Sequence, residues 1–153
     1  MNVRDVARNN KNISDHFGRS LSEVPITDKP VRRALLADDN HALCKYLIMA
    51  LKIIGFEVRT ARNGQEAYEL FLENSYDLVI TDFKMPVMNG ITLIRKLKSK
   101  SPNIPIILIS GVPIDDLSKI GCHAPIEGIL HKPFSLNELH RTALRAISRP
   151  QHA

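Results

Sequence analysis

Tryptophan is absent from this sequence, and aromatic residues make up only 5% of its 153 residues. Stacking platforms for single-stranded nucleic acid are built from aromatic side chains, so a protein of that class is not expected. No apolar run approaches the roughly 20 residues of a membrane-spanning helix. The first 20 residues contain no apolar stretch of signal-peptide length. We therefore expect a soluble, cytoplasmic protein without membrane insertion.

Cysteine is also scarce, since the sequence contains only Cys44 and Cys122, which lie far apart. The two residues form neither a CxxC pair nor the spacing of a zinc ribbon. In a cytosolic chain we expect both thiols to be reduced and to pack in the interior. His41 and Cys44 could share one face of a helix, but two potential ligands do not make a metal site.

Basic residues outnumber acidic residues by 21 to 16, which leaves a formal net charge of +5. The two signs are mixed along the chain: residues 1–30 hold five basic and four acidic residues, and residues 31–153 hold sixteen and twelve. Scattered Lys and Arg are typical of a solvated surface, so we expect no direct binding of DNA.

The chain divides into parts of different composition. Residues 1–30 are polar and show no periodicity, which predicts a flexible N-terminal tail. That tail could be a tether, a partner-binding segment or an overlong start. From Val31 onward, apolar runs alternate with segments of helical period, so we expect one folded domain over residues 31–149. Residues 150–153 would form a short C-terminal tail.

Five short apolar runs mark the expected strands. Three of them are continuous rather than alternating, as in strands buried on both faces of a parallel sheet. The expected strands cover residues 34–37, 56–60, 77–81, 105–110 and 127–130. Four helices are expected from residues at helical spacing. The first is marked by Leu43, Leu47, Leu51 and Ile54, and the second by Ala67, Leu70, Phe71 and Asn74 after the start signal Asn63-Gly64. The third is marked by Gly90, Ile94 and Leu97, and a weaker pattern covers residues 112–121. A last helix is predicted by the capping box of Ser135 and Glu138 and by the stripe of Leu136, Leu139, Ala143 and Ile147.

Five strand–helix units within residues 31–153 predict the α/β class, a doubly wound domain around a five-stranded parallel sheet. Parallel strands need helical crossovers, and those crossovers are right-handed. The leading topology is therefore flavodoxin-like, with strand order 2-1-3-4-5. Ligands of such sheets bind outside the carboxyl ends of the strands, at the switch point between strands 1 and 3.

Polar side chains stand at four of these carboxyl ends. In chain order they are Asp38, Asp39 and Asn40 after the first strand, Asp82 at the end of the third, Ser110 at the end of the fourth, and Lys132 after the fifth. Taken alone, the first group could simply cap a helix that begins near His41. Taken together, the predicted topology would bring three carboxylates, one hydroxyl and one ammonium into one pocket.

The chemistry of this set suits phosphate. Three carboxylates at close range repel one another, so a positive charge has to offset them. Mg²⁺ prefers oxygen ligands and commonly binds one or two carboxylates together with a phosphate oxygen. A carboxylate that keeps a free oxygen can act as a nucleophile, and Lys132 and Ser110 could bind the transferred oxygens. The pattern predicts phosphoryl transfer onto an aspartate.

From about Val31 to Ser148 the chain resembles the receiver domain of bacterial two-component response regulators, in particular single-domain regulators of the chemotaxis type. The strings LLADDN, LVITDFKMPVMNG, ILIS-G and LHKPF occur in the order of that family, and DFKMPVMNG after an apolar strand is the most specific of them. The resemblance implies that Asp82 accepts a phosphoryl group from a histidine kinase or a histidine phosphotransfer protein.

The resemblance also implies the metal site and the other functional groups. Mg²⁺ would be bound by Asp82, directly by Asp39, through water by Asp38, and by the backbone carbonyl of Lys84. Ser110 and Lys132 would contact the phosphoryl group, and the Lys132–Pro133 peptide bond would be cis. Such a protein catalyses only its own phosphorylation and dephosphorylation, and is otherwise not an enzyme.

Two positions depart from the family or extend it. Ile129 stands where the family often has Tyr or Phe, so signalling is expected to rest on Ser110 and on backbone shifts. Lys84 places a second ammonium near the pocket mouth, either as a solvated side chain or as a group that changes the lifetime of the acyl phosphate. His131 alternates with the strand residues and is expected to face outward.

The expected readout surface is the fourth helix, fifth strand and fifth helix, residues 112–149. Arg141, Arg145 and Arg149 recur at four-residue spacing there and form a basic ridge, which is either a solvated face or a docking site for an acidic partner. No output domain is expected after Ala153, so output would proceed by protein contact or by onward phosphoryl relay.

Three other functions stay open. An aspartate-nucleophile phosphatase would use the same metal, but its usual DxDx(T/V) motif and cap domain are not visible. A flavodoxin-type cofactor carrier would need a Ser/Thr- or Gly-rich phosphate loop where Asp38 and Asp39 stand. A phosphorylation-independent interaction module could use the same fold, although the set of Asp39, Asp82, Ser110 and Lys132 argues against it.

Overall fold

The structure is a computed structural model that describes residues 29–119, 123 and 125–150. Contacts divide the chain after Pro30, and the unit that starts at Val31 contains the helices and strands described below. Cys122 and residues 1–28 of the predicted tail lie outside the described residues. The elements are β1 (Arg32–Ala37), α1 (His41–Ile53), β2 (Phe56–Ala61), α2 (Gly64–Glu73), β3 (Leu78–Asp82), α3 (Gly90–Lys100), β4 (Ile106–Ser110), α4 (Ile114–Lys119), β5 (Gly128–His131) and α5 (Leu136–Ser148).

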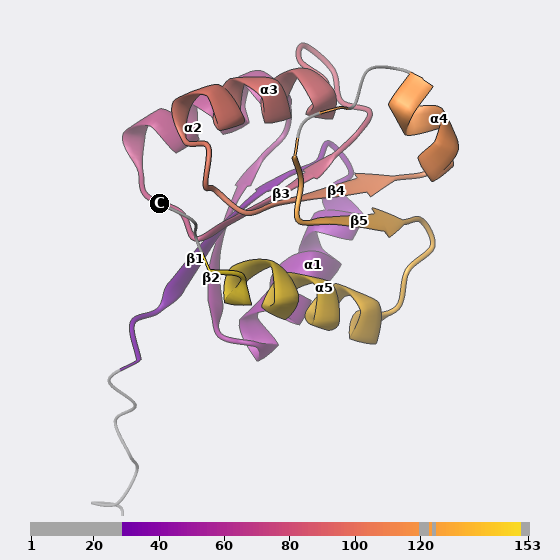
Figure 1. Ribbon diagram of the computed structural model, residues 1–153. Helices are drawn as coiled ribbons and strands as arrows, with labels where there is room; N and C mark the ends of the chain where they lie inside the picture. The colour runs from indigo at the N-terminus through magenta and orange to yellow at the C-terminus, as the bar shows by residue number, and fades with distance from the viewer. Residues whose placement is uncertain (1–28, 120–122, 124, 151–153) are drawn as a thin grey trace, which may run out of the picture. The chain divides into compact units, whose positions relative to one another are not determined.

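The strands form one parallel sheet in the order β2-β1-β3-β4-β5, as the sequence predicts (Figure 1). β1 lies between its two neighbours, so that Leu36 pairs with Thr60 of β2 and with Ile80 of β3. β2 is added on one side of β1, and β3, β4 and β5 are then added on the other side, so the order of the strands reverses between β1 and β3. This boundary is the switch point at which ligands of such sheets bind.

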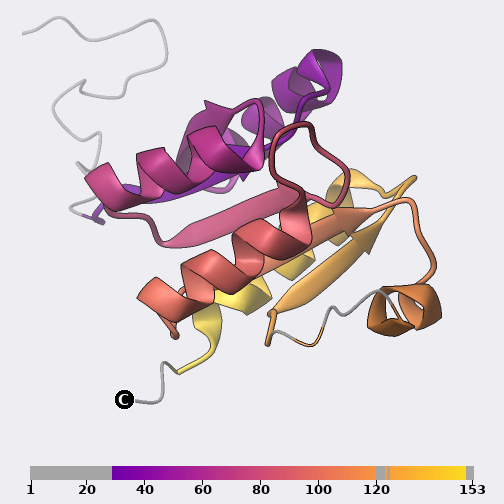
Figure 2. The ribbon, with the colours of Figure 1, turned by 90° about the horizontal axis from the view of Figure 1, so that it is seen from above.

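Helices cover both faces of the sheet, which explains the continuous apolar runs. Every residue of β3 and of β4 is buried. On one face α1 and α5 enclose an apolar cluster around Leu36, Ile80 and Leu130. On the other face α2, α3 and α4 cover a second cluster around Leu35, Val79 and Leu108 (Figure 2). Successive side chains of a strand point to opposite faces, so each central strand contributes to both clusters.

Each helix next to the switch point starts at a side chain that caps it. Asn40, Asn63 and Asn89 precede α1, α2 and α3, and each side chain accepts a hydrogen bond from a backbone N–H one turn on. The predicted capping box is also present, because Ser135 and Glu138 exchange hydrogen bonds at the start of α5.

The strands β2 to β5 begin and end within one residue of the expected ranges, and three other elements differ more clearly. β1 begins at Arg32 rather than at residue 34, because Arg32 and Arg33 already pair with Phe56 and Glu57 of β2, and the backbone N–H of Arg33 also donates to the carboxylate of Asp77 at 2.7 Å. α4 begins at Ile114 rather than at residue 112 and is described as far as Lys119, while residues 120 and 121 of the expected helix lie outside the described residues. Asn74 lies after α2 rather than on its buried stripe, and its amide donates to the carbonyl of Leu70 at 3.0 Å.

Among the described residues, no helix has the length and apolar character that a bilayer crossing requires. Cys44 is a free, buried thiol on α1, as expected. His41 is exposed at the start of the same helix, so the two side chains do not share an environment.

Candidate functional site

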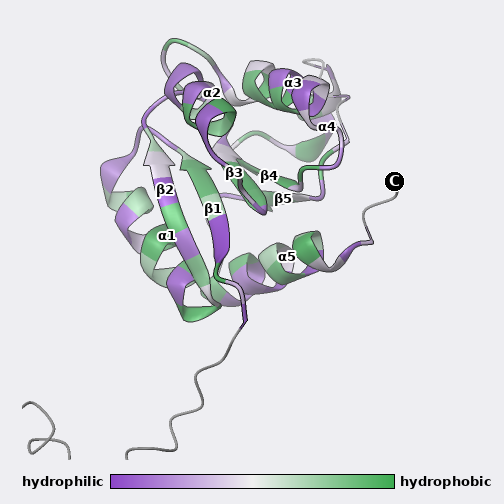
Figure 3. Ribbon diagram, turned by 90° about the vertical axis from the view of Figure 1, so that its left-hand side faces the viewer, coloured by the Kyte–Doolittle hydropathy of each residue, from purple (hydrophilic) through white to green (hydrophobic). Residues whose placement is uncertain are grey.

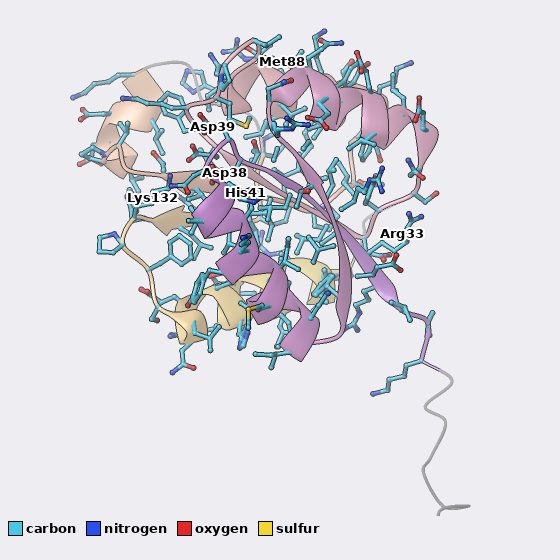
Figure 4. All side chains as sticks on the ribbon, turned by 180° about the vertical axis from the view of Figure 1, so that it is seen from behind. Arg33, Asp38, Asp39, His41, Met88 and Lys132 are labelled. Atoms are coloured by element: carbon cyan, nitrogen blue, oxygen red, sulfur yellow. The ribbon has the colours of Figure 1, made fainter. Side chains whose placement is uncertain are left out.

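The polar residues predicted from the strand ends do meet at one edge of the sheet. Figure 4 shows Asp38, Asp39 and Lys132 gathered at the carboxyl end of the strands, whereas Arg33 lies at the other end of β1. The carboxylates of Asp38, Asp39 and Asp82 each place an oxygen within 4.8 Å of the others. They come from the ends of β1 and β3, the two strands that flank the switch point.

The three carboxylates differ in burial. Asp38 is 2% exposed and Asp82 is 6% exposed, while Asp39 is exposed. The adjacent Asn40 is the residue that caps α1, so capping accounts for Asn40 but not for the two aspartates before it. Two acidic side chains at the start of a helix, one of them buried, therefore require another explanation.

Asp38 is the least satisfied of these groups. Its Oδ1 accepts a hydrogen bond from the backbone N–H of Asn40 at 2.8 Å, but its Oδ2 is buried without a partner. Burial raises the pKa of this carboxyl, and the charges of Asp82 and Asp39 raise it further, against the opposing effects of the Asn40 hydrogen bond and the Lys132 ammonium. A buried, unpartnered oxygen in a cluster of three carboxylates has the chemistry of a cation ligand.

Lys132 supplies the nearest positive charge. Its Nζ lies 3.0 Å from Oδ1 of Asp82, and the lysine side chain is 36% exposed against 9% for the aspartate. The backbone N–H of Lys132 donates to the carbonyl of Ser110 at 3.0 Å, which aligns the ends of β4 and β5. The Lys132–Pro133 peptide bond is cis, as the family resemblance implies.

An open pocket of about 250 Å³ lies beside this ion pair. Its lining consists of Asp82, Phe83, Lys84, Gly111, Val112 and Lys132. Asp82 therefore has a side that faces solvent although it is almost entirely buried. Lys84 is exposed at the mouth of the pocket, which agrees with its expected place near the site.

Ser110 lies at the predicted strand end but its hydroxyl is engaged elsewhere. The side chain is fully buried, and its Oγ accepts a hydrogen bond from the N–H of Val112 at 2.9 Å and contacts the carbonyl of the same residue at 3.3 Å. These bonds hold the hydroxyl within the loop after β4. The structure thus places Ser110 next to the pocket without an interaction with Asp82.

Comparison with known proteins fits this geometry. A family model, the response regulator receiver domain, matches residues 34–144. The chain belongs to this family. The response regulator receiver protein CpdR of Brucella abortus is 36% identical over 110 residues, which cover 71% of this chain and 91% of CpdR.

Other relatives contain the receiver domain as one part. The transcriptional regulatory protein PrrA of Mycobacterium tuberculosis is 34% identical over 107 residues, 70% of this chain but only 46% of PrrA. Among solved structures, a response regulator receiver domain protein from Clostridium thermocellum superposes with a TM-score of 0.71 at 31% identity, over 77% of this chain and 95% of that chain. The fold and the family expected from the sequence are confirmed.

Two glycines of the receiver domain bring its loops close to Asp82. A Cβ atom on Gly90 would collide with the carbonyl of Asp82, and one on Gly64 would lie 2.5 Å from the carbonyl of Met88. The N–H of Gly64 donates to that same carbonyl at 3.1 Å, so the loop after β3 is fastened to the start of α2. Both positions follow an Asn, and the Asn-Gly pairs were the sequence signal for them.

Cys44 is a neighbour of the site that sequence reasoning treated only as packing. Its thiol donates to the backbone carbonyl of Asp38 at 3.4 Å. Burial, and then the charges of Asp38, Asp39 and Asp82, raise the pKa of the thiol to about 11. The helical spacing from Asn40 to Cys44 was the available signal, since it places Cys44 one turn behind the cap.

The residues of the expected readout surface are accessible only in part. Ile129 is half-buried and packs against the cluster under α3 and α4. His131 is half-buried rather than turned fully outward. Arg141 and Arg145 are exposed on α5, and Arg149 is exposed directly after it, so the predicted basic ridge is solvent-accessible.

Proposed function

We propose that Asp82 accepts a phosphoryl group from a phosphohistidine donor in a Mg²⁺-dependent reaction, and that the phosphorylated domain signals by protein contact or by onward relay. The observation that carries the proposal is the position of Asp82. Its carboxylate is 3.0 Å from the Lys132 ammonium, within 4.8 Å of two further carboxylates, and at the wall of an open pocket.

The reaction would be a displacement at phosphorus. An oxygen of Asp82 forms the new P–O bond while the P–N bond to the donor imidazole breaks, and the imidazole leaves with a proton. The Lys132 ammonium would bind a transferred oxygen, and its contact with Asp82 at 3.0 Å supports this role. The product is one modified aspartate per chain, so we assign no turnover of a separate substrate.

Asp38, Asp39 and Asp82, with the backbone carbonyl of Lys84, would hold the cation. The unpartnered Oδ2 of Asp38 supports this assignment, because a metal or its bound water would satisfy that oxygen. Bound Mg²⁺ would offset the repulsion among the carboxylates and the charge of the phosphoryl oxygens. The acidic cluster is the part of the pocket suited to a metal, and Lys132 is the part suited to phosphate.

Switching would start at Ser110. A phosphoryl group on Asp82 offers strong acceptor oxygens, for which the hydroxyl could exchange its bond to the Val112 carbonyl. The loop after β4 would move with it and bias an equilibrium between two arrangements of α4 and β5. Ile129 cannot take part as an aromatic rotamer switch, so the signal would travel through the backbone of this loop.

The partners we propose are a histidine kinase or histidine phosphotransfer protein, docking near the pocket and α1, and a downstream protein on the surface of α4, β5 and α5. The exposed apolar side chains Tyr46, Met49 and Ile53 recur along one face of α1, the helix that begins directly after Asp38, Asp39 and its cap Asn40. No acidic residue occurs in α1 to oppose an acidic partner. We propose residues 31–149 as the receiver domain, acting in the cytoplasm without direct contact to DNA.

Intact-mass measurement tests the proposal. The full chain is incubated with Mg²⁺ and a small-molecule phosphodonor such as acetyl phosphate. One added phosphate, acid-stable and base-labile, is expected on the native chain and none on Asp82→Asn. Asp39→Asn should lower the yield because it removes a cation ligand and leaves the acceptor. No phosphate at any Mg²⁺ concentration would support an interaction module, and steady hydrolysis of added phosphoesters would support a phosphatase.

A further inference from the structure

β2 forms a long and unblocked edge of the sheet. Among the described residues β2 pairs with β1 alone and lies at one edge of the sheet (Figure 3). It has six residues, whereas the opposite edge strand β5 has four. Edge strands are commonly protected by proline, by a bulge or by charged side chains, and a strand with charges of both signs can still match a second copy of itself in one register. The β2 sequence FEVRTA contains neither proline nor glycine, and its register with β1 runs without interruption from Arg32 to Ala37.

The unpaired backbone groups of this edge can be assigned. The carbonyl of Ala61 accepts from the N–H of Asp38, so Ala61 directs its backbone groups toward β1. Backbone groups alternate along a strand, so Glu57 and Arg59 also face β1. Phe56, Val58 and Thr60 therefore present their N–H and C=O groups outward, where no strand of the described part of the chain pairs with them.

Two exposed side chains of β2, Glu57 and Arg59, carry charges of opposite sign. Glu57 and Arg59 are both exposed and point to the same face of the sheet, while Val58 between them turns to the other face. Among the residues that the structure describes, neither Glu57 nor Arg59 forms a salt bridge. The strand thus carries one unpaired charge of each sign, on either side of a central apolar residue.

We propose that β2 pairs antiparallel with β2 of a second copy of this chain, with the two-fold axis at Val58. Val58 would form a doubly hydrogen-bonded pair with its own equivalent, and Phe56 would pair with Thr60 of the other copy. Glu57 would lie opposite Arg59 of the other copy in the closely spaced, non-hydrogen-bonded position. The two sheets would become one continuous sheet.

Charge selects this register over its neighbours. A shift that centres the pair on Glu57 sets two glutamates opposite each other, and one that centres it on Arg59 sets two arginines opposite each other. Both alternatives keep the hydrogen-bonding parity of the edge, but like charges directly opposite are destabilising. The register centred on Val58 makes two pairs of opposite charge by symmetry.

The surroundings of β2 leave room for a strand. Hollows of about 360 Å³ and 380 Å³ border it, and both are lined in part by Val58, Arg59 and Leu70. Side chains of α1 and α2 therefore do not fill the space beside the strand. The pairing does not depend on the phosphoryl chemistry proposed above, because Glu57 and Arg59 belong to neither the metal cluster nor the pocket.

Sedimentation velocity on the full chain tests the pairing, over concentrations up to about 1 mM, the weak end of specific association. A reversible monomer–dimer equilibrium is expected. Arg59→Glu and Glu57→Arg should each raise the dissociation constant at least about tenfold, because each makes both cross-strand pairs alike in charge. The double exchange Glu57→Arg/Arg59→Glu should restore dimerisation to within about threefold, since it reverses both charges together.

Three further variants complete the test. Arg141→Glu changes an equally exposed charge on α5 and should leave the dimer unchanged. Val58→Pro removes an outward N–H without touching the bonds to β1 and should abolish the dimer. Asp82→Asn should dimerise normally, so failure of phosphorylation and failure of pairing are distinguishable. A chain that is monomeric throughout, or a dimer that Arg59→Glu leaves intact or the double exchange fails to restore, would overturn the proposal.

Discussion

The sheet holds a lysine–carboxylate pair at each end, and the two pairs differ in what surrounds them. At the amino end of the strands, Lys98 Nζ is 3.1 Å from Glu127. The same ammonium donates to the carbonyl of Ile104 at 2.7 Å, and the glutamate accepts from the N–H of Ile106 at 2.6 Å. At the carboxyl end, Lys132 meets Asp82 at 3.0 Å beside two more carboxylates and an unpartnered oxygen.

The contrast separates a structural pair from a functional one. The Lys98–Glu127 pair is satisfied within the protein, since each member also binds the backbone of β4 or of the turn before it. The Lys132–Asp82 pair leaves negative charge in excess and one face toward a pocket. A buried pair with every partner present holds the fold together, whereas a partly exposed pair beside further carboxylates and an unpartnered oxygen is suited to binding a ligand.

Lys98→Met should produce the largest loss of stability. The substitution leaves Glu127 partly buried without its cation and the Ile104 carbonyl without its donor, which should lower the free energy of unfolding by about 3 kcal/mol. Urea unfolding followed by circular dichroism measures the change. Phosphorylation of the folded fraction should proceed at the native rate, because the substituted side chain lies at the other end of the sheet.

Lys132→Met is the matched substitution and should reverse this pattern. In the presence of Mg²⁺, the free energy of unfolding should fall by less in Lys132→Met than in Lys98→Met. The Lys132 side chain is 36% exposed, and a bound cation can offset the same carboxylates. The rate of phosphorylation should fall about 100-fold with the loss of one charge that stabilises the transferred oxygens. Equal losses of stability in the two variants, with phosphorylation intact in both, would remove the distinction between the pairs.

Asp38→Asn should stabilise the metal-free protein. Asparagine keeps the acceptor for the Asn40 N–H but removes a buried charge, and at neutral pH the gain should be about 1 kcal/mol, the order of an unsatisfied buried group. The folded pKa of Asp38 is raised, so its ionisation destabilises the fold as pH rises above the ordinary value of 3.8. The advantage of the variant should therefore shrink as pH is lowered toward that value.

Mg²⁺ should reverse which protein is more stable, the native chain or the Asp38→Asn variant. The native chain gains a cation for three carboxylates, while the variant offers only two, so the melting temperature should rise more for the native chain. Thermal melts with and without Mg²⁺ at pH 7 and at about pH 4.5 measure both effects. A native chain that is already the more stable protein without the metal would contradict the account of Asp38 as an unsatisfied ligand.

Much of the fold could be predicted from the sequence because the central strands are buried on both faces. The continuous apolar runs of β3 and β4 are typical of strands buried on both faces, and their alternation with helices favours a doubly wound parallel sheet, for which 2-1-3-4-5 is the leading strand order. Asp38, Asp39, Asp82 and Lys132 could be placed together for the same reason, since each stands directly at a strand end.

What could not be predicted depends on contacts between distant segments. The hydroxyl of Ser110 is turned to Val112, and only the conformation of its loop decides that. Lys98 and Glu127 are 29 positions apart, and no pattern in the sequence links them. The extension of β1 to Arg32 likewise depends on pairing with Phe56 of β2, which is distant in the sequence.

The smallest expected effect is that of Lys84 on the lifetime of the acyl phosphate, and it tests whether Lys132 is the one ammonium that matters at the Asp82 pocket. Its exposed side chain borders the pocket beside Asp82, where it can lie over an acyl phosphate and keep water from the phosphorus atom. Lys84→Ala should therefore speed hydrolysis of the phosphorylated protein by only about threefold, since an exposed charge interacts weakly across water. The decay of the phosphorylated mass with time measures the rate, with Lys100→Ala, an exposed lysine at the end of α3, as the matched control. If the Lys84→Ala protein decays at the native rate, the ammonium is a solvated side chain and Lys132 alone governs the positive side of the pocket.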